Sequence, residues 1–172
     1  KGLKPNKIIY NVLDLIINVL RSFPFIILIV FIIPLTRAIV GTPIGEAAAI
    51  VPLTIAAAPF VARIIESSLK EVDSGVIEAA KSFGASNTQI IFKVMLKEAV
   101  PSIISGLTLT IINIIGYSAM AGSVGAGGLG KVAISYGYQR YQTDVMIVTV
   151  IILIIMVQGL QSLGNYLYKK LS

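Results

Sequence analysis

Long apolar runs alternate with short polar segments along this chain, and several runs have the length that a bilayer requires. A hydrocarbon core about 30 Å thick is crossed by roughly 20 helical residues. Four runs meet this requirement: residues 23–40, 47–65, 102–121 and 145–167. Prolines interrupt the first two, but neighbouring helices can satisfy the carbonyls that proline frees inside a membrane. The pattern predicts one all-α, multi-pass membrane domain over residues 1–172 with four transmembrane helices.

The stretch before the first run is amphipathic. Asn11, Asp14, Asn18 and Arg21 follow one another at helical spacing and share one face of an otherwise apolar segment, residues 8–20. A helix of this kind either lies at the cytoplasmic interface or extends the first span. Its polar face is either solvated or lines a cytoplasmic vestibule.

Basic residues indicate which ends of the spans face the cytoplasm. The chain has 14 lysines and arginines. Three fall on one side of the predicted spans, namely Arg37, Lys131 and Arg140. The other eleven fall on the opposite side: Lys1, Lys4, Lys7, Arg21, Arg63, Lys70, Lys81, Lys93, Lys97, Lys169 and Lys170. Since cytoplasmic loops carry the excess of positive charge, residues 1–22, residues 66–98 and the C-terminus are predicted to be cytoplasmic.

Composition supports the membrane assignment and argues against most catalytic functions. Hydrophobic residues make up 56% of the chain, and its mean hydropathy is +0.90. Cysteine and histidine are both absent, so a cysteine nucleophile, thiolate metal ligands, the commonest general base and the commonest transition-metal ligand are missing. The net charge of +6 forms no continuous basic face, which argues against a nucleic-acid partner. We expect no enzyme activity and no cofactor.

The acidic residues near the spans also bear on function. Glu46, Glu98 and Asp144 all fall near predicted interfaces, and none is at the midpoint of a span. A carrier coupled to protons or ions usually needs an ionisable group or a broken-helix ion site at the midplane. A secondary transporter or channel is therefore a weaker alternative.

A polar insert, residues 66–100, separates the second and third spans. Asp73 or Ser74 can cap a helix that starts near Gly75, and Gly84 can end it in the left-handed conformation. Ser86 and Gln89 then form the pattern of a capping box that starts another helix toward Pro101. Helices this short are not stable alone, so the insert is predicted to be a docking surface outside the bilayer.

Within this insert, Glu78, Ala79, Ala80 and Gly84 are followed by Val94 and Leu96 at the spacing of a known motif. The pattern resembles the "EAA" coupling segment of ABC-transporter permeases, which inserts into a cleft of the ATPase subunit. The family commonly has proline directly after the final leucine, whereas this chain has Lys97. Pro101 suggests that the break before the next span has moved there. An ordinary cytoplasmic helical loop is the plainer alternative.

The resemblance covers essentially the whole chain and is closest to the methionine-uptake permeases. The similar segments are residues 21–28, 49–54, 116–122 and 124–130. It implies the type I ABC importer permease fold. Those permeases have five spans, so we expect an N-terminal span before Lys1.

The same resemblance implies partners and a location. They are a second copy of the chain in a homodimer, two cytoplasmic ATP-binding subunits, an extracytoplasmic substrate-binding protein and the lipid bilayer of the bacterial cytoplasmic membrane. The ATPase activity would belong to the partner subunits. This chain would form the path for methionine by alternating access. A permease of the same fold for another amino acid or small solute is the main alternative.

The third span carries a stripe of small and polar residues on one face. Its members are Ser102, Gly106, Thr110, Asn113, Tyr117 and Met120. Polar groups are costly in hydrocarbon, so the stripe faces either a water-filled path or another helix. Thr110, Asn113, Tyr117 and Met120 are the candidate path residues, and Met120, among small neighbours, is either a plug or a gap-filler.

Of two common nucleotide-binding patterns, one is matched only formally and the other is absent. Residues 125–130 formally match G-x-G-x-x-G, but they follow a membrane span instead of a β-strand. We expect an irregular, tightly packed outer loop there. No G-x-x-x-x-G-K-[ST] sequence is present, so any ATP must bind to another chain.

Overall fold

The computed structural model describes Leu3 and residues 5–171, without the side chains of Ser123 and Val124. Lys1 and Lys4, two of the residues that the charge count places in the cytoplasm, lie outside the described residues. Regular structure in the described part of the chain is helical throughout, with no strand. The predicted all-α class is confirmed.

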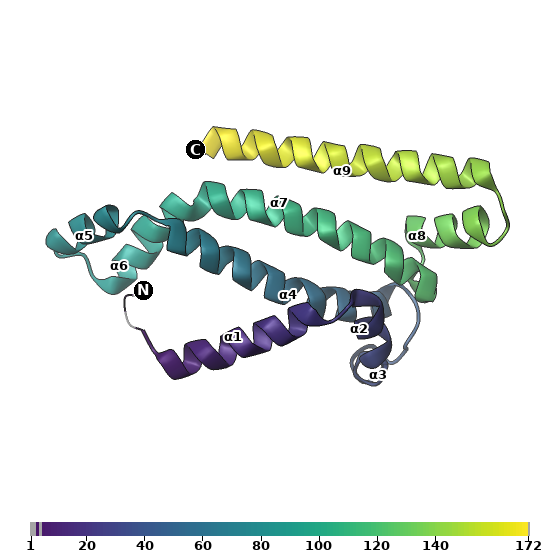
Figure 1. Cartoon of the computed structure of the whole chain (residues 1–172), viewed down its shortest axis with the longest axis horizontal. Coiled ribbons are helices and arrows are strands. Elements are labelled where there is room, and N and C mark those ends of the chain that lie inside the picture. The colour runs from purple at the N-terminus through teal and green to yellow at the C-terminus, as the bar shows by residue number, and fades with distance from the viewer. Residues whose placement is uncertain (1–2, 4, 172) are drawn as a thin grey trace.

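Four long helices lie side by side: α1 (Lys7–Ser22), α4 (Glu46–Glu71), α7 (Leu96–Ala121) and α9 (Thr143–Leu171) (Figure 1). Helix α4 packs between α1 and α7, and α7 packs between α4 and α9. Shorter elements occupy the two ends of this layer. At one end are α5 (Ser74–Ser82), α6 (Asn87–Gln89) and the π-helical turn η1 (Ile90–Met95), together with the start of α1 and the end of α9.

At the opposite end lie α2 (Phe25–Phe31), α3 (Ile33–Val40), the π-helical η2 (Gly122–Ala126), α8 (Gly128–Val132) and the π-helical η3 (Ala133–Tyr138) (Figure 1). In the glycine-rich segment, residues 125–130, Gly125, Gly127 and Gly128 have positive φ, so the backbone is irregular as predicted, although η2 and α8 give it more helix than a loop. Its close packing is confirmed, because a Cβ at Gly122 would come within 2.5 Å of the Lys131 amide nitrogen.

Three helices of the described chain are long and apolar enough to cross a membrane: Glu46–Glu71, Asn87–Ala121 and Thr143–Leu171. A fourth crossing results if α1 and α2, which meet at an angle of 101°, are taken as one broken span. The predicted single helix over residues 23–40 is not formed. Pro24 holds Phe23 in an extended conformation, and Pro34 lacks the N–H that would continue α2, so the run divides into α2 and α3.

Helix α1 turns its polar face toward the protein and its apolar face outward. Asp14 and Asn18 hydrogen-bond to Arg63 of α4, whereas Ile8 and Leu15 are 77% and 64% exposed. An outward apolar face suits a helix in contact with lipid, whereas a helix at an aqueous surface would expose its polar face. Arg21 lies 5.0 Å from the ring centre of Phe60, near the middle of α4. It is therefore not at the cytoplasmic end, where the charge count places it.

Small residues let the long helices approach closely. A Cβ at Gly106 of α7 would overlap Ile64 of α4, and a Cβ at Gly164 of α9 would overlap Thr108 of α7. The buried cluster of the protomer is small and consists of Phe25, Leu28, Ile32, Ala56 and Ala121. Large apolar side chains on the outer faces of α1 and α9 stay exposed. Lipid or other chains must cover those faces.

Candidate functional site

The polar insert folds into an elbow that projects from one end of the layer (Figure 1). Helix α5 begins where the Asp73 carboxylate accepts a hydrogen bond from the Gly75 amide at 2.6 Å. It ends at Gly84, whose φ of +76° is strained for any residue with a Cβ. The Ala85 amide donates to the Ala80 carbonyl and the Gly84 amide to the Lys81 carbonyl. These bonds form a Schellman motif, and the predicted cap and stop are confirmed.

The predicted capping box is also present. The Ser86 hydroxyl accepts from the Gln89 amide at 3.3 Å, and the Gln89 side chain accepts from the Ser86 amide at 2.8 Å. The helix that starts here is continuous through α6, η1 and α7 to Ala121. Pro101 lies inside α7, so the expected break at Pro101 does not occur. The elbow and the third span therefore belong to one continuous rod of helix.

The predicted coupling residues divide into an exposed group and a bracing group. Glu78 and Ala79 are exposed on α5, Gly84 is exposed beyond its end, and Ala80 is half-buried. Val94 in η1 and Leu96 at the start of α7 are half-buried and face the protein. At the tip, Phe83 is 92% exposed. Val76 of α5 and Phe92 of η1 are also exposed, so this end of the chain offers several large apolar side chains to a partner.

Ile90, which the sequence patterns did not single out, secures the elbow. It is the fully buried large side chain of the described chain, with 0% exposure, and η1 packs against α5. The sequence gives little indication that Ile90 is buried, because an isoleucine after a capping box is an ordinary apolar helix position. With α5 fixed against η1, the elbow is a rigid projection of the long helix.

The stripe on α7 divides between packing and exposure. Ser102 accepts a hydrogen bond from Ser68 at 2.9 Å and donates to Glu71 at 2.9 Å, both on α4. Thr110 is buried and donates to the Gly106 carbonyl. Tyr117 stacks on Phe25 with ring centres 4.6 Å apart. Ser102 and Tyr117 therefore join α7 to other helices of the chain, whereas the Thr110 bond lies within α7.

The exposed members of the stripe alternate with the packed ones along the second half of α7. Asn113 is exposed, and Met120 is 50% exposed near the outer end. A shallow groove of about 650 Å³ lies close by, lined by α4 with Ile114 of α7. Its lining is apolar and includes Thr54, Ala57, Ala58 and Val61. Small residues in such a groove allow another helix to approach closely.

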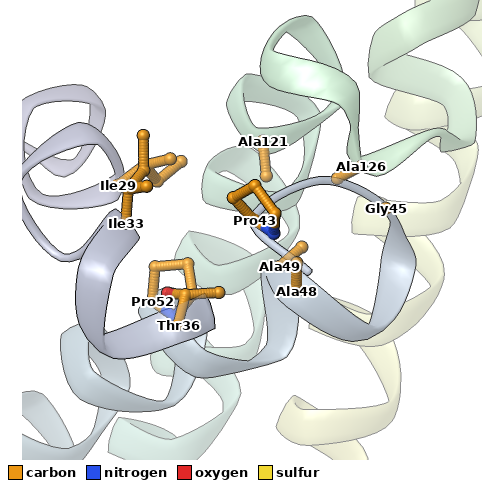
Figure 2. Close-up of a pocket in the computed structure, with 10 residues that line it drawn as sticks. All are labelled: Ile29, Ile33, Thr36, Pro43, Gly45, Ala48, Ala49, Pro52, Ala121 and Ala126. Atoms are coloured by element: carbon orange, nitrogen blue, oxygen red, sulfur yellow. The ribbon is translucent and has the colours of Figure 1, made fainter. Parts of the chain in front are cut away.

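A separate cavity near the outer end is too small for an amino acid. It has a volume of about 20 Å³ and is lined from α2, α3, α4 and the end of α7 (Figure 2). Small side chains such as Ala48, Ala49 and Ala121 line it, together with Thr36 and Pro52 (Figure 2). The volume suffices for about one water molecule. It is not a substrate site.

A network of charged and polar groups joins α1 to α4, and the sequence patterns did not predict it. Arg63 donates to Asp14 at 2.6 Å, to Asn18 at 2.8 Å and to Glu66 at 2.7 Å. Lys70 donates to Glu66 at 2.6 Å and to the Tyr10 hydroxyl at 3.3 Å. Spacing on α1 revealed a polar face, but nothing in the sequence identified its partner 49 residues away.

Several known membrane permeases are similar to this chain in sequence. A protein of Vibrio cholerae named probable D-methionine transport system permease protein MetI is 54% identical over 170 residues, which is 99% of this chain and 76% of that protein. The methionine import system permease protein MetP of Bacillus subtilis is 46% identical over 160 residues, 93% of this chain and 72% of that protein.

Solved structures show the same fold. A chain from the inward-facing conformations of the MetNI methionine ABC transporter matches with a TM-score of 0.95 and 46% identity, covering 99% of this chain and 79% of that one. The sequence profile described as binding-protein-dependent transport system inner membrane component matches residues 1–172. This chain belongs to the family of binding-protein-dependent transport system inner membrane components.

Proposed function

We propose that this chain is the membrane-spanning subunit of an ATP-driven importer for methionine. The names of its relatives in Vibrio cholerae and Bacillus subtilis support the substrate. The single observation that supports the mode of action is the ordered elbow with Phe83 at its tip, 92% exposed at one end of a multi-pass helical layer. The chain catalyses no covalent reaction, and ATP hydrolysis belongs to a partner subunit.

The elbow docks on a cytoplasmic ATP-binding subunit. Glu78, Ala79 and Ala80 present one short helix to that subunit, and Gly84 sets the direction in which the chain leaves it. Val94 and Leu96 brace the elbow against the start of α7. Because α6, η1 and α7 form one continuous helix from Asn87 to Ala121, movement of the docked elbow is transmitted along α7.

Two copies of the chain enclose the translocation path. Asn113 and Met120 are exposed on the single protomer, and the small-residue groove of α4 lies on the surface close to α7. Thr110 and Tyr117 position the neighbouring part of α7 through their contacts within the protomer. A substrate-binding protein delivers methionine at the opposite end from the elbow, and lipid covers the outer faces of α1 and α9.

Substitution at the elbow tip tests the docking role. We expect Phe83→Ser to reduce co-purification of the ATP-binding subunits and uptake in parallel, because an exposed ring contributes to an interface without supporting the fold. Tyr141→Ser is the matched control, since Tyr141 is 88% exposed at the opposite end. Co-purification is measured from detergent extracts, with membrane insertion checked by immunoblot. Unchanged co-purification for Phe83→Ser would contradict docking at this tip.

Uptake by the purified complex tests the substrate. In proteoliposomes we expect accumulation of radiolabelled methionine that requires ATP and the binding protein. Unlabelled methionine should compete, whereas amino acids without a thioether should compete weakly. ATP-dependent uptake of a different amino acid instead of methionine would support an ATP-driven importer but contradict methionine as its substrate. Uptake driven by an ion gradient without ATP would support a secondary transporter and contradict the proposal.

A further inference from the structure

We propose that Asp14 and Arg63 are positioning residues that fasten α1 to the last turns of α4, so that α1 moves together with the elbow during transport. The inference rests on the proposed coupling role of the elbow and adds a second element that follows it. Helix α1 is separated from the elbow in sequence by several helices. Side-chain contacts between α1 and α4 must therefore couple the movement of α1 to that of the elbow.

The contacts form a connected set with balanced charge. Arg63 donates to the Asp14 carboxylate and to the side-chain amide oxygen of Asn18, both on α1, and the Asn18 side chain donates to Asp14 at 3.0 Å. On α4 the same guanidinium also holds Glu66, which accepts from Lys70. Two acids and two bases therefore compensate one another. The side chains of Arg63, Asp14 and Glu66 are 26%, 33% and 23% exposed, so most of the surface of each is covered by the protein.

The attachment of α1 relies on these polar contacts, because none of its residues is buried. Its large apolar side chains Ile8, Leu15 and Val19 are at least half exposed and point away from α4. Between helices in lipid there is no hydrophobic driving force, because lipid tails are as apolar as leucine. Separating α1 from α4 would leave Asp14 and Arg63 unpaired in a setting where isolated charges are costly. The pair therefore keeps α1 in place.

The network is located where it can follow the elbow. Arg63, Glu66 and Lys70 occupy one face of the last turns of α4, and α5 begins at Ser74. A second face of the same turns holds α7, through Ser68 and Glu71 bonded to Ser102. The end of α4 thus joins α1, α7 and the elbow in one junction.

A displacement of α1 would reach the outer half of the molecule. Helix α1 bends by 101° into α2 at Phe23 and Pro24, and Phe25 of α2 stacks on Tyr117 of the candidate path. The hydrogen-bonded network involves Tyr10, Asp14 and Asn18, in the first half and middle of α1, and the aromatic contact lies just beyond the C-terminal end of α1. Together they give the elbow a second connection to Tyr117 besides the continuous helix that contains α7.

Spin labels on the assembled transporter test whether α1 and α4 move as one unit. The chain has no native cysteine, so labels can be placed at Leu13 of α1 and Ser67 of α4, both exposed, without background. We expect the distance between the labels to be the same in the nucleotide-free complex and in the complex trapped with ATP and vanadate. In an Arg63→Gln background, we expect the distance to differ between the two states.

Transport measurements supply a readout that a merely structural role would not change. We expect Asp14→Asn and Arg63→Gln to lower the methionine imported per ATP hydrolysed by about fivefold or more. Co-purification of the ATP-binding subunits should persist. Asp14→Glu and Arg63→Lys, which keep the ion pair, should retain most of this ratio. Asn11→Ala, on the same face of α1 and exposed, is the matched control.

The two proposals fail in different ways. A label distance that changes between states with the Asp14–Arg63 pair intact would overturn the proposed attachment of α1 to α4, even if the neutral variants do not assemble. An unchanged ratio of transport to hydrolysis in assembled neutral variants would overturn it as well. Failure of elbow docking would instead appear in the Phe83→Ser experiment, which leaves α1 intact.

Discussion

Replacing glycine by alanine is expected to have opposite effects on stability at different positions of this chain, and the backbone conformation at each position determines the sign. At Gly84 a Cβ would meet no atom within 4 Å, but φ is +76°. At Gly159, in the middle of α9, a Cβ would also meet nothing within 4 Å, and the backbone is helical. The two positions therefore separate backbone strain from steric crowding.

We expect Gly84→Ala to destabilise the elbow by about 1 kcal/mol, because a residue with a Cβ is strained in the left-handed region. Gly159→Ala should instead be neutral or stabilising by up to about 1 kcal/mol, since alanine is the better helix former. Thermal unfolding of the purified complex and co-purification of the ATP-binding subunits measure both effects. Equal behaviour of the two variants would show that the left-handed turn is unimportant.

At the scale of elements, the distance between α4 and α7 depends on Gly106. Ile64 of α4 occupies the space that a side chain at this position would need. The two helices are also joined by the hydrogen bonds of Ser68 and Glu71 with Ser102, one turn of α7 away. Close approach of α4 and α7 at Gly106 therefore sets the interhelical distance at which Ser68 and Glu71 reach Ser102, near the start of the elbow.

We expect Gly106→Leu to destabilise the protein by about 1–3 kcal/mol through overpacking against Ile64. Ile64→Ala in the same chain should recover a substantial part of this loss, because it removes the overlapping atoms. A double-mutant cycle on the unfolding midpoint in detergent gives the coupling between the two positions. Strictly additive effects would mean that the helices separate or rotate instead of clashing.

At the scale of the whole molecule, the elbow and the segment around Tyr141 lie at opposite ends of the helical layer (Figure 1). The elbow end also holds the start of α1 and the end of α9, with Lys169 and Lys170 in its last turn. The lengths of α4, α7 and α9 match a bilayer crossing. The two ends should therefore face opposite sides of the membrane.

Cysteine labelling of intact cells tests this arrangement. Since the chain lacks native cysteine, Ser82→Cys and Tyr141→Cys each provide a single reactive position. In cells that express this chain without the ATP-binding subunits, so that no docked partner shields the elbow, we expect an impermeant maleimide to modify Tyr141→Cys from outside. Ser82→Cys should react only after permeabilisation. The basis is the excess of Lys and Arg at the elbow end. Modification of Ser82→Cys in intact cells would place the elbow outside and contradict coupling to a cytoplasmic subunit.

Much of the fold was predictable because its signals are local. Apolar runs of sufficient length predicted the long helices α4, α7 and α9, and turn chemistry at Asp73, Gly84 and Ser86 predicted both ends of the elbow. The break of the first run was not predicted, although Pro24 and Pro34 were visible. Whether a proline kinks or ends a membrane helix depends on neighbours that satisfy the freed carbonyls, and those neighbours come from distant parts of the chain.

What the sequence by itself determined is the membrane class, the helical elbow and the inventory of polar groups, since each follows from spacing along one stretch of chain. Only the tertiary structure decided the partners of those groups: Asp14 with Arg63, Ser102 with Glu71, and Phe25 with Tyr117. The physical reason is that periodicity shows which side of a helix is polar, but contact requires the packing of whole helices against one another. That packing depends on distant close approaches such as Gly106 on Ile64.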